Sequence, residues 1–369
     1  MRVALVCPYD VSRPGGVQGQ VLGLARALGV LGHDSVVLAP ADAPVPPPGP
    51  RAQVVGLGRA VPVPANGSVA PVALNPLVAA RARRAVREAE VDVVHLHEPL
   101  APVAGYGCLL AGREPMIATF HRAGAGVGYR LLGALARPVA RRLAVRCAVS
   151  PEAAATASAV LPGAYEVVGN GVDVDRFATS SPWPAEGPTV LFVGRHERRK
   201  GLGVLLEAFG RLDPTRATLW VVGRGPETEA LRTRLPAHSQ VRWLGQVDDD
   251  ELASRLAGAD VLCAPSLGGE SFGMVLVEAM AAGTPVVASD IPGYAFVAGE
   301  HARLVSPGDA GALAAALAEV LTDAEHAVGV ASPAALDRAR AHAAHWSMAR
   351  LAERYVARYE AAAATAPGH

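Results

Sequence analysis

Lysine is almost missing from this chain of 369 residues. Lys200 is the single lysine among the 34 Lys and Arg residues, and all the others are arginine. An ammonium is a compact point charge and a guanidinium is a wide planar fork, so the two are not interchangeable at a tight phosphate site. Two interpretations stay open: Lys200 is required at such a site, or it has simply escaped replacement by arginine.

A net charge is also missing, because 34 Lys and Arg balance 34 Asp and Glu. The halves differ, since residues 1–169 carry 16 Arg against 10 acidic residues and the remainder has the opposite excess. A nucleic-acid-binding protein should show a larger basic excess, so no nucleic-acid partner is predicted. The positive balance of the N-terminal half permits an anionic surface as its partner.

Cysteines and long apolar runs are scarce. The four cysteines stand singly in apolar segments without metal or disulfide spacing, and are Cys7, Cys108, Cys147 and Cys263. We expect them to be buried thiols in a reducing compartment. The sequence shows no signal-peptide pattern and no run of about 18 apolar residues. The chain is therefore expected to be soluble, or at most attached to a membrane surface.

Strand-like runs alternate with glycine-containing loops and helical segments along the chain. The runs lie at 2–7, 36–39, 91–97, 117–121 and 145–149, and then at 190–193, 219–222, 241–244 and 260–264. This alternation predicts an α/β fold with two Rossmann-like domains. Asn170–Asp173 marks the crossover between them, and the proline-rich segment 179–188 is the predicted linker. NAD is not implied, because the G-x-G-x-x-G fingerprint is absent.

The most informative segment runs from Ser266 to Ala288, SLGGESFGMVLVEAMAAGTPVVA. A Gly-Gly loop precedes a helix that is expected to begin at Ser271, and such an N-terminus suits a phosphate. Eight residues of helix would separate Glu270 and Glu278 by roughly 12 Å, too far for the paired carboxylates of a glycosidase. They suit two parts of one elongated ligand, or else they face water on a packed helix.

Three histidines occur near strand ends. His95 and His97 share one face of a strand, but no third ligand is visible, so no metal site is predicted. His121 ends another strand, at the edge where open α/β sheets bind ligands. Both a structural and a functional role remain open for His121.

Arginine clusters on two predicted helical segments of the N-terminal half. The arginines from Arg130 to Arg146 interleave with apolar residues in the pattern of a basic amphipathic helix. An anionic membrane and ordinary solvent explain this pattern equally well. The residues predicted to bind a membrane are Arg81, Arg83, Arg84, Arg130, Arg137, Arg141 and Arg142.

Several motifs resemble one enzyme family. They are N-G-V-D at 170–173, G-R-x(4)-K-G at 194–201, G-x-G at 223–225 and E-S-F-G-x(3)-V-E-A-M-A-A-G-x-P-V-V from Glu270. With these motifs in order along nearly the whole chain, it resembles the retaining GT-B glycosyltransferases of family 4. V-C-P-Y, P-G-G-V-Q, N-G-S-V-A, H-x-H-E-P, A-T-F-H and L-G-Q-V-D-D further resemble the actinobacterial phosphatidyl-myo-inositol mannosyltransferases within it.

The resemblance implies two Rossmann-like domains facing across a cleft. A C-terminal helix would cross back, so that 1–169 with 348–369 binds the acceptor and 170–347 binds the sugar nucleotide. The implied reaction moves mannose from GDP-mannose to the inositol ring of phosphatidylinositol, with retention and without a metal cofactor. The implied location is the cytoplasm, peripherally on the inner face of the plasma membrane.

The resemblance also assigns roles to residues. Those implied in catalysis are His121, Arg195, Lys200 and Glu270. Those implied in donor binding are Gly16, Arg195, Lys200, Val247, Glu270, Ser271, Phe272, Gly273, Met274 and Glu278. Those implied in acceptor binding are Tyr9, Gln18, Asn66, Ser68 and Arg199.

Four positions depart from the subfamily's usual pattern. Ala65 and Pro71 replace a tyrosine and an arginine beside the Asn-Gly-Ser loop, Arg122 replaces a threonine, and Leu252 replaces a lysine near the nucleobase. They leave open a soluble acceptor, such as an inositol phosphate or a natural product, or another nucleotide-sugar donor. A sugar-nucleotide epimerase and a non-catalytic sugar-nucleotide binder are the remaining alternatives.

Overall fold

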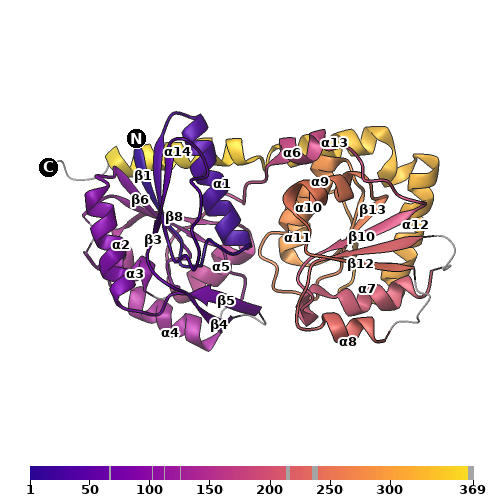
Figure 1. Ribbon diagram of the computed structural model, residues 1–369, viewed down its shortest axis with the longest axis horizontal. Coiled ribbons are helices and arrows are strands. Elements are labelled where there is room, and N and C mark those ends of the chain that lie inside the picture. Colours follow the sequence, from indigo (N-terminus) through magenta and orange to yellow (C-terminus); the bar gives the residue numbers. More distant parts are fainter. Residues whose placement is uncertain are drawn as a thin grey trace. The chain divides into compact units, whose positions relative to one another are not determined.

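The chain forms two compact α/β units, each built on its own sheet (Figure 1). The computed structural model describes residues 1–65, 68–101, 103–111, 113–124, 126–212, 217–234 and 240–364. Unit 1 comprises Met1–Gly171 and Met348–His369, and unit 2 comprises Val172–Ser347. The predicted α/β class is confirmed.

Unit 1 contains a seven-stranded parallel sheet in the order β3-β2-β1-β6-β7-β8-β9. Its central strands are buried along almost their whole length because both faces of the sheet are covered. The strands are β1 (Arg2–Val6), β2 (Asp34–Ala39), β3 (Ala52–Gly56), β6 (Val93–His97), β7 (Met116–Phe120), β8 (Leu143–Ala148) and β9 (Glu166–Val167). β4 (Val61–Ala65) and β5 (Ser68–Val72) form a separate antiparallel pair.

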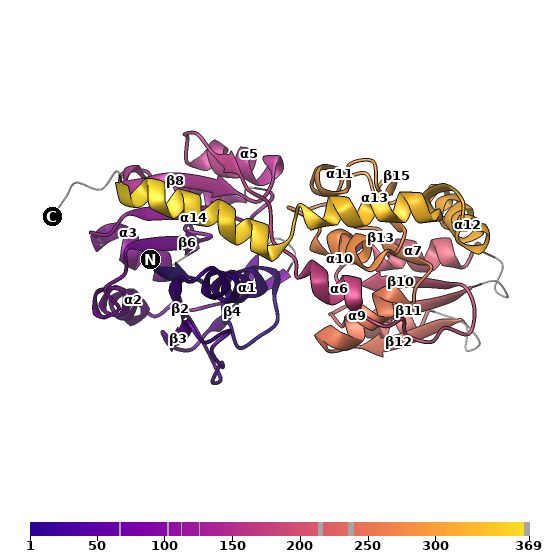
Figure 2. The same cartoon turned by 90° about the horizontal axis from the view of Figure 1, so that it is seen from above.

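Helices cover this sheet on both faces. Their bounds are α1 (Gly16–Val30), α2 (Leu77–Glu88), α3 (Ala104–Ala111), α4 (Val127–Ala136), η1 (Ala140–Arg142), α5 (Pro151–Val160) and α14 (Met348–Ala364). One core joins the sheet to α2, α3, α4 and α5, and a second core joins it to α1 and α14. Figure 2 shows α14 running alongside α1 over unit 1. Leu351, Tyr355 and Tyr359 of α14 are buried in the second core.

Unit 2 contains a six-stranded parallel sheet in the order β12-β11-β10-β13-β14-β15. The strands are β10 (Thr189–Val193), β11 (Thr218–Val222), β12 (Val241–Gly245), β13 (Val261–Ala264), β14 (Val286–Ser289) and β15 (Arg303–Val305). The helices are α6 (Val174–Thr179), η2 (Arg198–Lys200), α7 (Leu202–Phe209), α8 (Thr228–Arg232), α9 (Asp249–Ala257), α10 (Met274–Ala282), α11 (Pro292–Ala298), α12 (Ala310–His326), η3 (Gly329–Ala331) and α13 (Pro333–Ala344).

The expected amphipathic helix from Arg130 to Arg146 is wrong. α4 ends at Ala136, the short helix η1 follows, and Arg146 lies in strand β8. Pro138 accounts for the break, because proline has no N–H to donate to the preceding turn of the helix and its ring crowds the carbonyl of that turn. The arginines of this segment therefore lie on three different elements.

The expected linker at 179–188 is also wrong, because this largely exposed segment belongs to unit 2 and is attached to it through Trp183. The Trp183 N–H donates to the Ser254 carbonyl over 2.8 Å, and the Arg255 guanidinium lies 3.8 Å from the centre of the Trp183 ring. The chain instead passes between units at Gly171–Val172 and Ser347–Met348. Val172 N–H donates to the Trp346 carbonyl over 2.8 Å, which ties the two passages together within unit 2.

All four cysteines are buried and unpaired with one another, as predicted. Burial raises the pKa of the Cys7, Cys108 and Cys147 thiols to about 12, so they are inert as nucleophiles. No helix among the described residues has the length and apolar character that a membrane span requires.

Candidate active site

The order of strands in unit 2 brings two loops to one place. β10 and β13 are neighbours in the sheet although β11 and β12 come between them in the sequence. Ligands of open α/β sheets bind at such a switch point, outside the carboxyl ends of the strands. The loop after β10 holds Arg195 to Lys200, and the loop after β13 holds Glu270. The Leu267 N–H donates to the Arg199 carbonyl over 2.7 Å, which pairs these loops directly.

Opposite charges alternate through the paired loops. Lys200 Nζ lies 2.9 Å from Glu270 Oε1, and Arg199 Nη1 contacts the same oxygen at 2.5 Å. Arg199 Nε lies 3.1 Å from Glu197 Oε2, and Arg195 Nη2 lies 3.0 Å from Glu197 Oε1. Three cations thus face two carboxylates, which leaves one positive charge for an anionic ligand.

A glycine makes the close approach of these loops possible. Gly201 follows Lys200 with φ +71°, in the left-handed region that favours glycine. A Cβ at this position would lie 1.9 Å from the Pro265 carbonyl oxygen. Any other residue would push the loop of Lys200 away from the loop of Glu270.

Helix α10 begins at Met274, not at Ser271 as expected. Gly273 caps it with φ +99°, and a Cβ there would lie 2.5 Å from the Tyr294 ring. Glu270 therefore lies in the loop, and the separation calculated along a helix does not describe the Glu270–Glu278 pair. The Tyr294 hydroxyl is 2.8 Å from Ser266 Oγ, which fixes the ring against this loop.

Other predicted donor residues surround this helix start. Phe272 is buried, with its ring centre 5.1 Å from that of Trp346 in an edge-to-face contact. Ser271 precedes it in the loop, and Val247 lies between β12 and α9. Burial raises the pKa of Glu278 to about 7, an effect that the nearby Lys200 opposes. Glu278 thus changes charge near neutral pH.

The predicted residues of unit 1 form a second group. Tyr9 follows β1, and Gly16 opens α1 after the extended Gly15. The Gln18 side chain donates from Nε2 to the Asp10 carbonyl over 3.3 Å. Asn66 lies outside the described residues, and Ser68 opens β5.

His121 lies directly after β7 and is held from two sides. Its backbone N–H donates to Glu98 Oε2 over 2.9 Å, and its ring atom Nε2 is 3.1 Å from His97 Nδ1. Glu98 is a buried carboxylate whose other oxygen accepts from the Tyr129 hydroxyl over 3.0 Å. Burial lowers the pKa of His121 to about 3, so its ring is neutral at physiological pH.

The neighbouring histidines do not form a metal site. Both ring nitrogens of His95 are 2.8 Å from hydroxyls, Nδ1 from Tyr359 and Nε2 from Thr119. Nowhere in the described part of the chain do three or more His, Cys, Asp or Glu residues form a group that could hold a metal ion.

Several of the predicted membrane-binding arginines make bonds within unit 1. Arg81 donates to the Leu57 carbonyl, Arg137 to the Val160 carbonyl and Arg142 to the Leu109 carbonyl. Arg84 forms an ion pair with Glu88 at 2.7 Å. Arg83, Arg130 and Arg141 are exposed, and their side chains make no ion pair or hydrogen bond with the described residues.

Four contributors were not identified from the sequence. Glu197 links two cations, Glu98 anchors His121, Tyr294 supports the loop before α10, and Trp346 covers Phe272. For the two glutamates a signal was available, since Glu98 directly follows a buried strand and Glu197 lies between the predicted site residues Arg195 and Lys200. The two aromatic residues lie beyond the motifs and gave no such signal.

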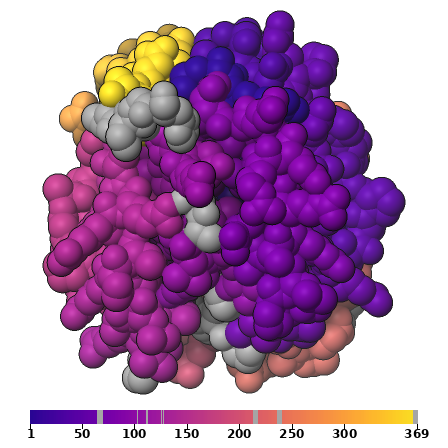
Figure 3. Space-filling view, turned by 90° about the vertical axis from the view of Figure 1, so that its left-hand side faces the viewer, coloured from indigo at the N-terminus to yellow at the C-terminus, as the bar shows by residue number. Residues whose placement is uncertain are grey.

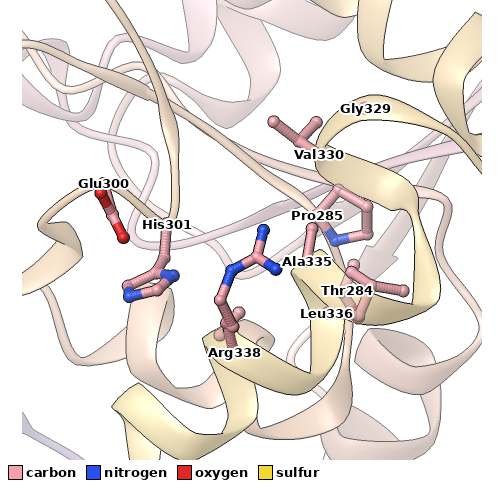
Figure 4. A pocket seen from close by; sticks show the side chains of 10 residues that line it. Thr284, Pro285, Glu300, His301, Gly329, Val330, Ala335, Leu336 and Arg338 are labelled. Atoms are coloured by element: carbon pink, nitrogen blue, oxygen red, sulfur yellow. The ribbon is translucent and has the colours of Figure 1, made fainter.

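A separate cavity of about 270 Å³ lies elsewhere in unit 2 (Figure 4). It is bordered by Glu300, His301 and Arg338 together with Thr284 and Pro285. It contains none of the residues predicted to act in catalysis or binding.

Comparisons with known proteins agree along the chain. A family model described as Glycosyltransferase Family 4 matches residues 14–176, and one described as Glycosyl transferases group 1 matches residues 187–323. The phosphatidyl-myo-inositol mannosyltransferase of Mycolicibacterium smegmatis is 42% identical over 357 residues, with 94% of this chain and 91% of that protein covered. The chain belongs to glycosyltransferase family 4.

Further relatives of this family 4 enzyme extend the match. The Mycobacterium leprae protein of the same name is 43% identical over 333 residues, covering 87% of each chain. Sucrose-phosphate synthase from Thermosynechococcus elongatus superimposes with a TM-score of 0.79 at 22% identity over 98% of each chain, which shows the shared GT-B fold. The chain is therefore a retaining glycosyltransferase, and its family implies a nucleotide-sugar donor.

Proposed function

We propose that this enzyme transfers mannose from GDP-mannose to the inositol ring of phosphatidylinositol, at the inner face of the plasma membrane. The single observation that carries the donor half of the proposal is the ion-pair network around Glu270. Its excess positive charge lies on Lys200, Arg199 and Arg195, beside the start of α10. The mannosyltransferase names of the relatives support the choice of sugar and acceptor.

In this proposal Lys200 and Arg195 bind the diphosphate of the donor. Negative charge develops on the leaving phosphate as the glycosidic bond breaks, and fixed cations stabilise it in the transition state. The backbone of Gly16 approaches the diphosphate, and the N–H groups of Phe272, Gly273 and Met274 donate to it. The leaving phosphate accepts the proton of the attacking inositol hydroxyl, on the same face of the sugar.

Glu270 binds the hydroxyls of the sugar and Glu278 binds the ribose. Both ion pairs of Glu270 with described residues use Oε1, so Oε2 can accept from a sugar hydroxyl. Holding Oε1 between Arg199 and Lys200 fixes the direction of the carboxylate. Arg199 was expected at the acceptor, and its contacts with Glu197 and Glu270 favour a role on the donor side instead.

The membrane half of the proposal relies on α4. Leu131 and Leu135 are 63% and 64% exposed, and they lie one helical turn apart. Arg130 in α4 and Arg137, directly after its last residue, flank them. Figure 3 shows one face of unit 1, where purple and magenta atoms form most of the surface. Apolar side chains flanked by arginine are typical of a helix lying on an anionic bilayer.

The experiment is product mass spectrometry after incubating the full chain with GDP-mannose and phosphatidylinositol vesicles. We expect one added hexose on the lipid, and product formation slowed by about 10²- to 10³-fold with Lys200→Met. Lipid that stays unmodified while GDP-mannose binds would overturn the acceptor assignment.

A second candidate keeps the donor chemistry but uses a soluble acceptor such as an inositol phosphate. It rests on Arg122, which replaces the threonine that is usual in the mannosyltransferases that this chain resembles. Its Nε donates to the Gly124 carbonyl over 2.9 Å, and its guanidinium lies 4.9 Å from the centre of the Tyr129 ring. Hexose on a soluble inositol phosphate, in an assay without lipid, would select this candidate.

A further inference from the structure

The ring of His121 meets a second histidine ring that is itself buried. His97 Nδ1 lies 3.1 Å from His121 Nε2, and the two rings are stacked with centres 5.3 Å apart. His97 is 3% exposed, whereas His121 is half-buried and reaches the surface of unit 1. A hydrogen bond between two ring nitrogens needs one N–H and one lone pair, so the tautomers of both rings are coupled.

Two arrangements of the protons are possible. In the first, His97 donates from Nδ1, His121 accepts at Nε2, and the proton of His121 is on Nδ1. In the second, His121 donates from Nε2 and His97 must carry its own proton on Nε2. The two arrangements therefore differ in what they require of His97 Nε2.

His97 Nε2 is shut off from solvent, and none of the described residues offers it a hydrogen-bond partner. The second arrangement would leave a buried N–H without an acceptor, which costs about 1 to 3 kcal/mol and is rare in proteins. The first leaves only a lone pair at this position. The neighbouring His95 cannot accept from this N–H, because its two ring nitrogens are already hydrogen-bonded to Tyr359 and Thr119.

We propose that His97 is a positioning residue that holds His121 as the tautomer protonated on Nδ1. This inference deepens the proposed function, since it specifies what His121 presents to a bound ligand. His121 then offers an N–H donor, which binds an oxygen acceptor such as a sugar hydroxyl or a phosphate oxygen. The opposite tautomer would offer a lone pair and would repel the same oxygen.

The surroundings keep the pair in this state. The His121 backbone N–H donates to the Glu98 carboxylate, which fixes the backbone that carries the ring. The His95 ring packs on His97 with centres 4.1 Å apart, which restricts rotation of His97. Burial lowers the pKa of both His97 and His121, so neither ring gains a second proton near neutral pH. The donor is thus a neutral imidazole.

The test is nitrogen-15 NMR of the full chain labelled at histidine. Chemical shifts distinguish protonated from unprotonated ring nitrogens, and the His121→Gln variant assigns the signals. We expect protonated Nδ1 and unprotonated Nε2 for His121 without ligand, and loss of that preference in His97→Leu. Protonation of His121 on Nε2 in the unsubstituted chain would overturn the inference. This readout needs no turnover, so it remains valid even if the proposed reaction is wrong.

A second pair of variants connects the tautomer to function. In His97→Asn the amide N–H takes the place of Nδ1–H, whereas His97→Leu has no donor. We expect His97→Leu to lower kcat/KM by about tenfold or more, as a wrong histidine tautomer does in other enzymes, and His97→Asn to recover most of it. His301→Asn, at the remote cavity of unit 2, is the matched control. Equal losses in His97→Asn and His97→Leu would contradict a role in donating to His121.

Discussion

Lys200 and Glu270 come from loops after different strands, and Lys200 Nζ lies 2.9 Å from Glu270 Oε1. The adjacency of β10 and β13 creates this pair, and Gly201 permits it by leaving room for the Pro265 carbonyl. The single lysine of the chain therefore contacts this carboxylate, and in the proposed function it also binds the donor diphosphate. Arginine already occupies the other side of the same oxygen.

Lys200→Met removes this cation while keeping an unbranched side chain. We expect kcat to fall by about 10²- to 10³-fold, the usual loss when one group that stabilises transition-state charge is removed. Steady-state assays with GDP-mannose measure it. Arg198→Met is the control, because Arg198 is exposed and adjacent in sequence. A similar fall in both variants would show that general loss of charge, and not the position of Lys200, is responsible.

Gly273→Ala disturbs the start of α10. The new Cβ would lie 2.5 Å from the Tyr294 ring, at a φ of +99° that alanine rarely adopts. We expect GDP-mannose to bind at least tenfold more weakly by isothermal calorimetry. Gly203→Ala in α7 is the control, because its nearest neighbour is at an ordinary 3.6 Å and alanine favours a helix. Unchanged affinity in Gly273→Ala would exclude a role of this helix start in donor binding.

Donor affinity should depend on pH through Glu278. Its pKa of about 7 means that the carboxylate is largely protonated at pH 6 and ionised at pH 8. An ionised carboxylate accepts more strongly from ribose hydroxyls, so we expect affinity for GDP-mannose to rise several-fold between these values. Glu278→Gln should flatten the profile. A slope that survives in Glu278→Gln would assign the dependence to another group.

The same group affects folding stability in the opposite direction. The pKa of Glu278 is raised on folding from 4.5 to about 7, so the folded protein binds the proton more tightly. Its contribution to the unfolding free energy is fully present below pH 4.5 and is lost as pH rises through 7. We expect Glu278→Gln to gain thermal stability relative to the unsubstituted chain at pH 8, but not at pH 4.5. Differential scanning calorimetry of unit 2's transition measures this difference.

Leu131→Ser combined with Leu135→Ser tests the membrane face of α4. Both side chains are exposed, so their loss should leave the folded state intact. We expect at least tenfold weaker sedimentation with anionic phosphatidylinositol vesicles, since each leucine buried in lipid contributes about 1.5 to 3 kcal/mol. Val328→Ser in unit 2 is the control, because Val328 is also exposed, at 49%. If the Leu131→Ser, Leu135→Ser double variant bound the vesicles as well as the Val328→Ser control does, α4 would not be the membrane contact.

Much of the fold could be predicted because the strands of both sheets are short apolar runs bounded by glycine and proline. One prediction was wrong because a helical pattern in the sequence continues past a proline that ends the helix. The arginines and leucines from Arg130 to Arg146 fit one helix on paper, but Pro138 divides them among α4, η1 and β8. Similarly, three prolines suggested a linker at 179–188, yet Trp183 packs under Arg255.

The candidate site could be predicted where the motifs themselves contain its charged residues, as for Lys200 and Glu270, which the structure brings together. Supporting contacts were not predictable, because they join residues far apart in sequence. Glu197 lies in a segment of basic residues, which drew attention away from it. Tyr294 and Trp346 contact the loop before α10 only because the tertiary fold brings them there. Spacing along the chain reports periodicity within one element, but not which elements become neighbours.

Helix α14 belongs to unit 1 but follows unit 2 in the sequence, which affects folding during synthesis on the ribosome. Unit 1 begins at Met1, but the helix that completes its second core starts only at Met348. At about 5 to 20 residues per second, roughly 10 to 35 s pass between translation of Gly171 and Met348. During that interval the side of α1 that packs against α14 lacks its partner helix, so we expect unit 1 to complete its second core only after unit 2 has been synthesised.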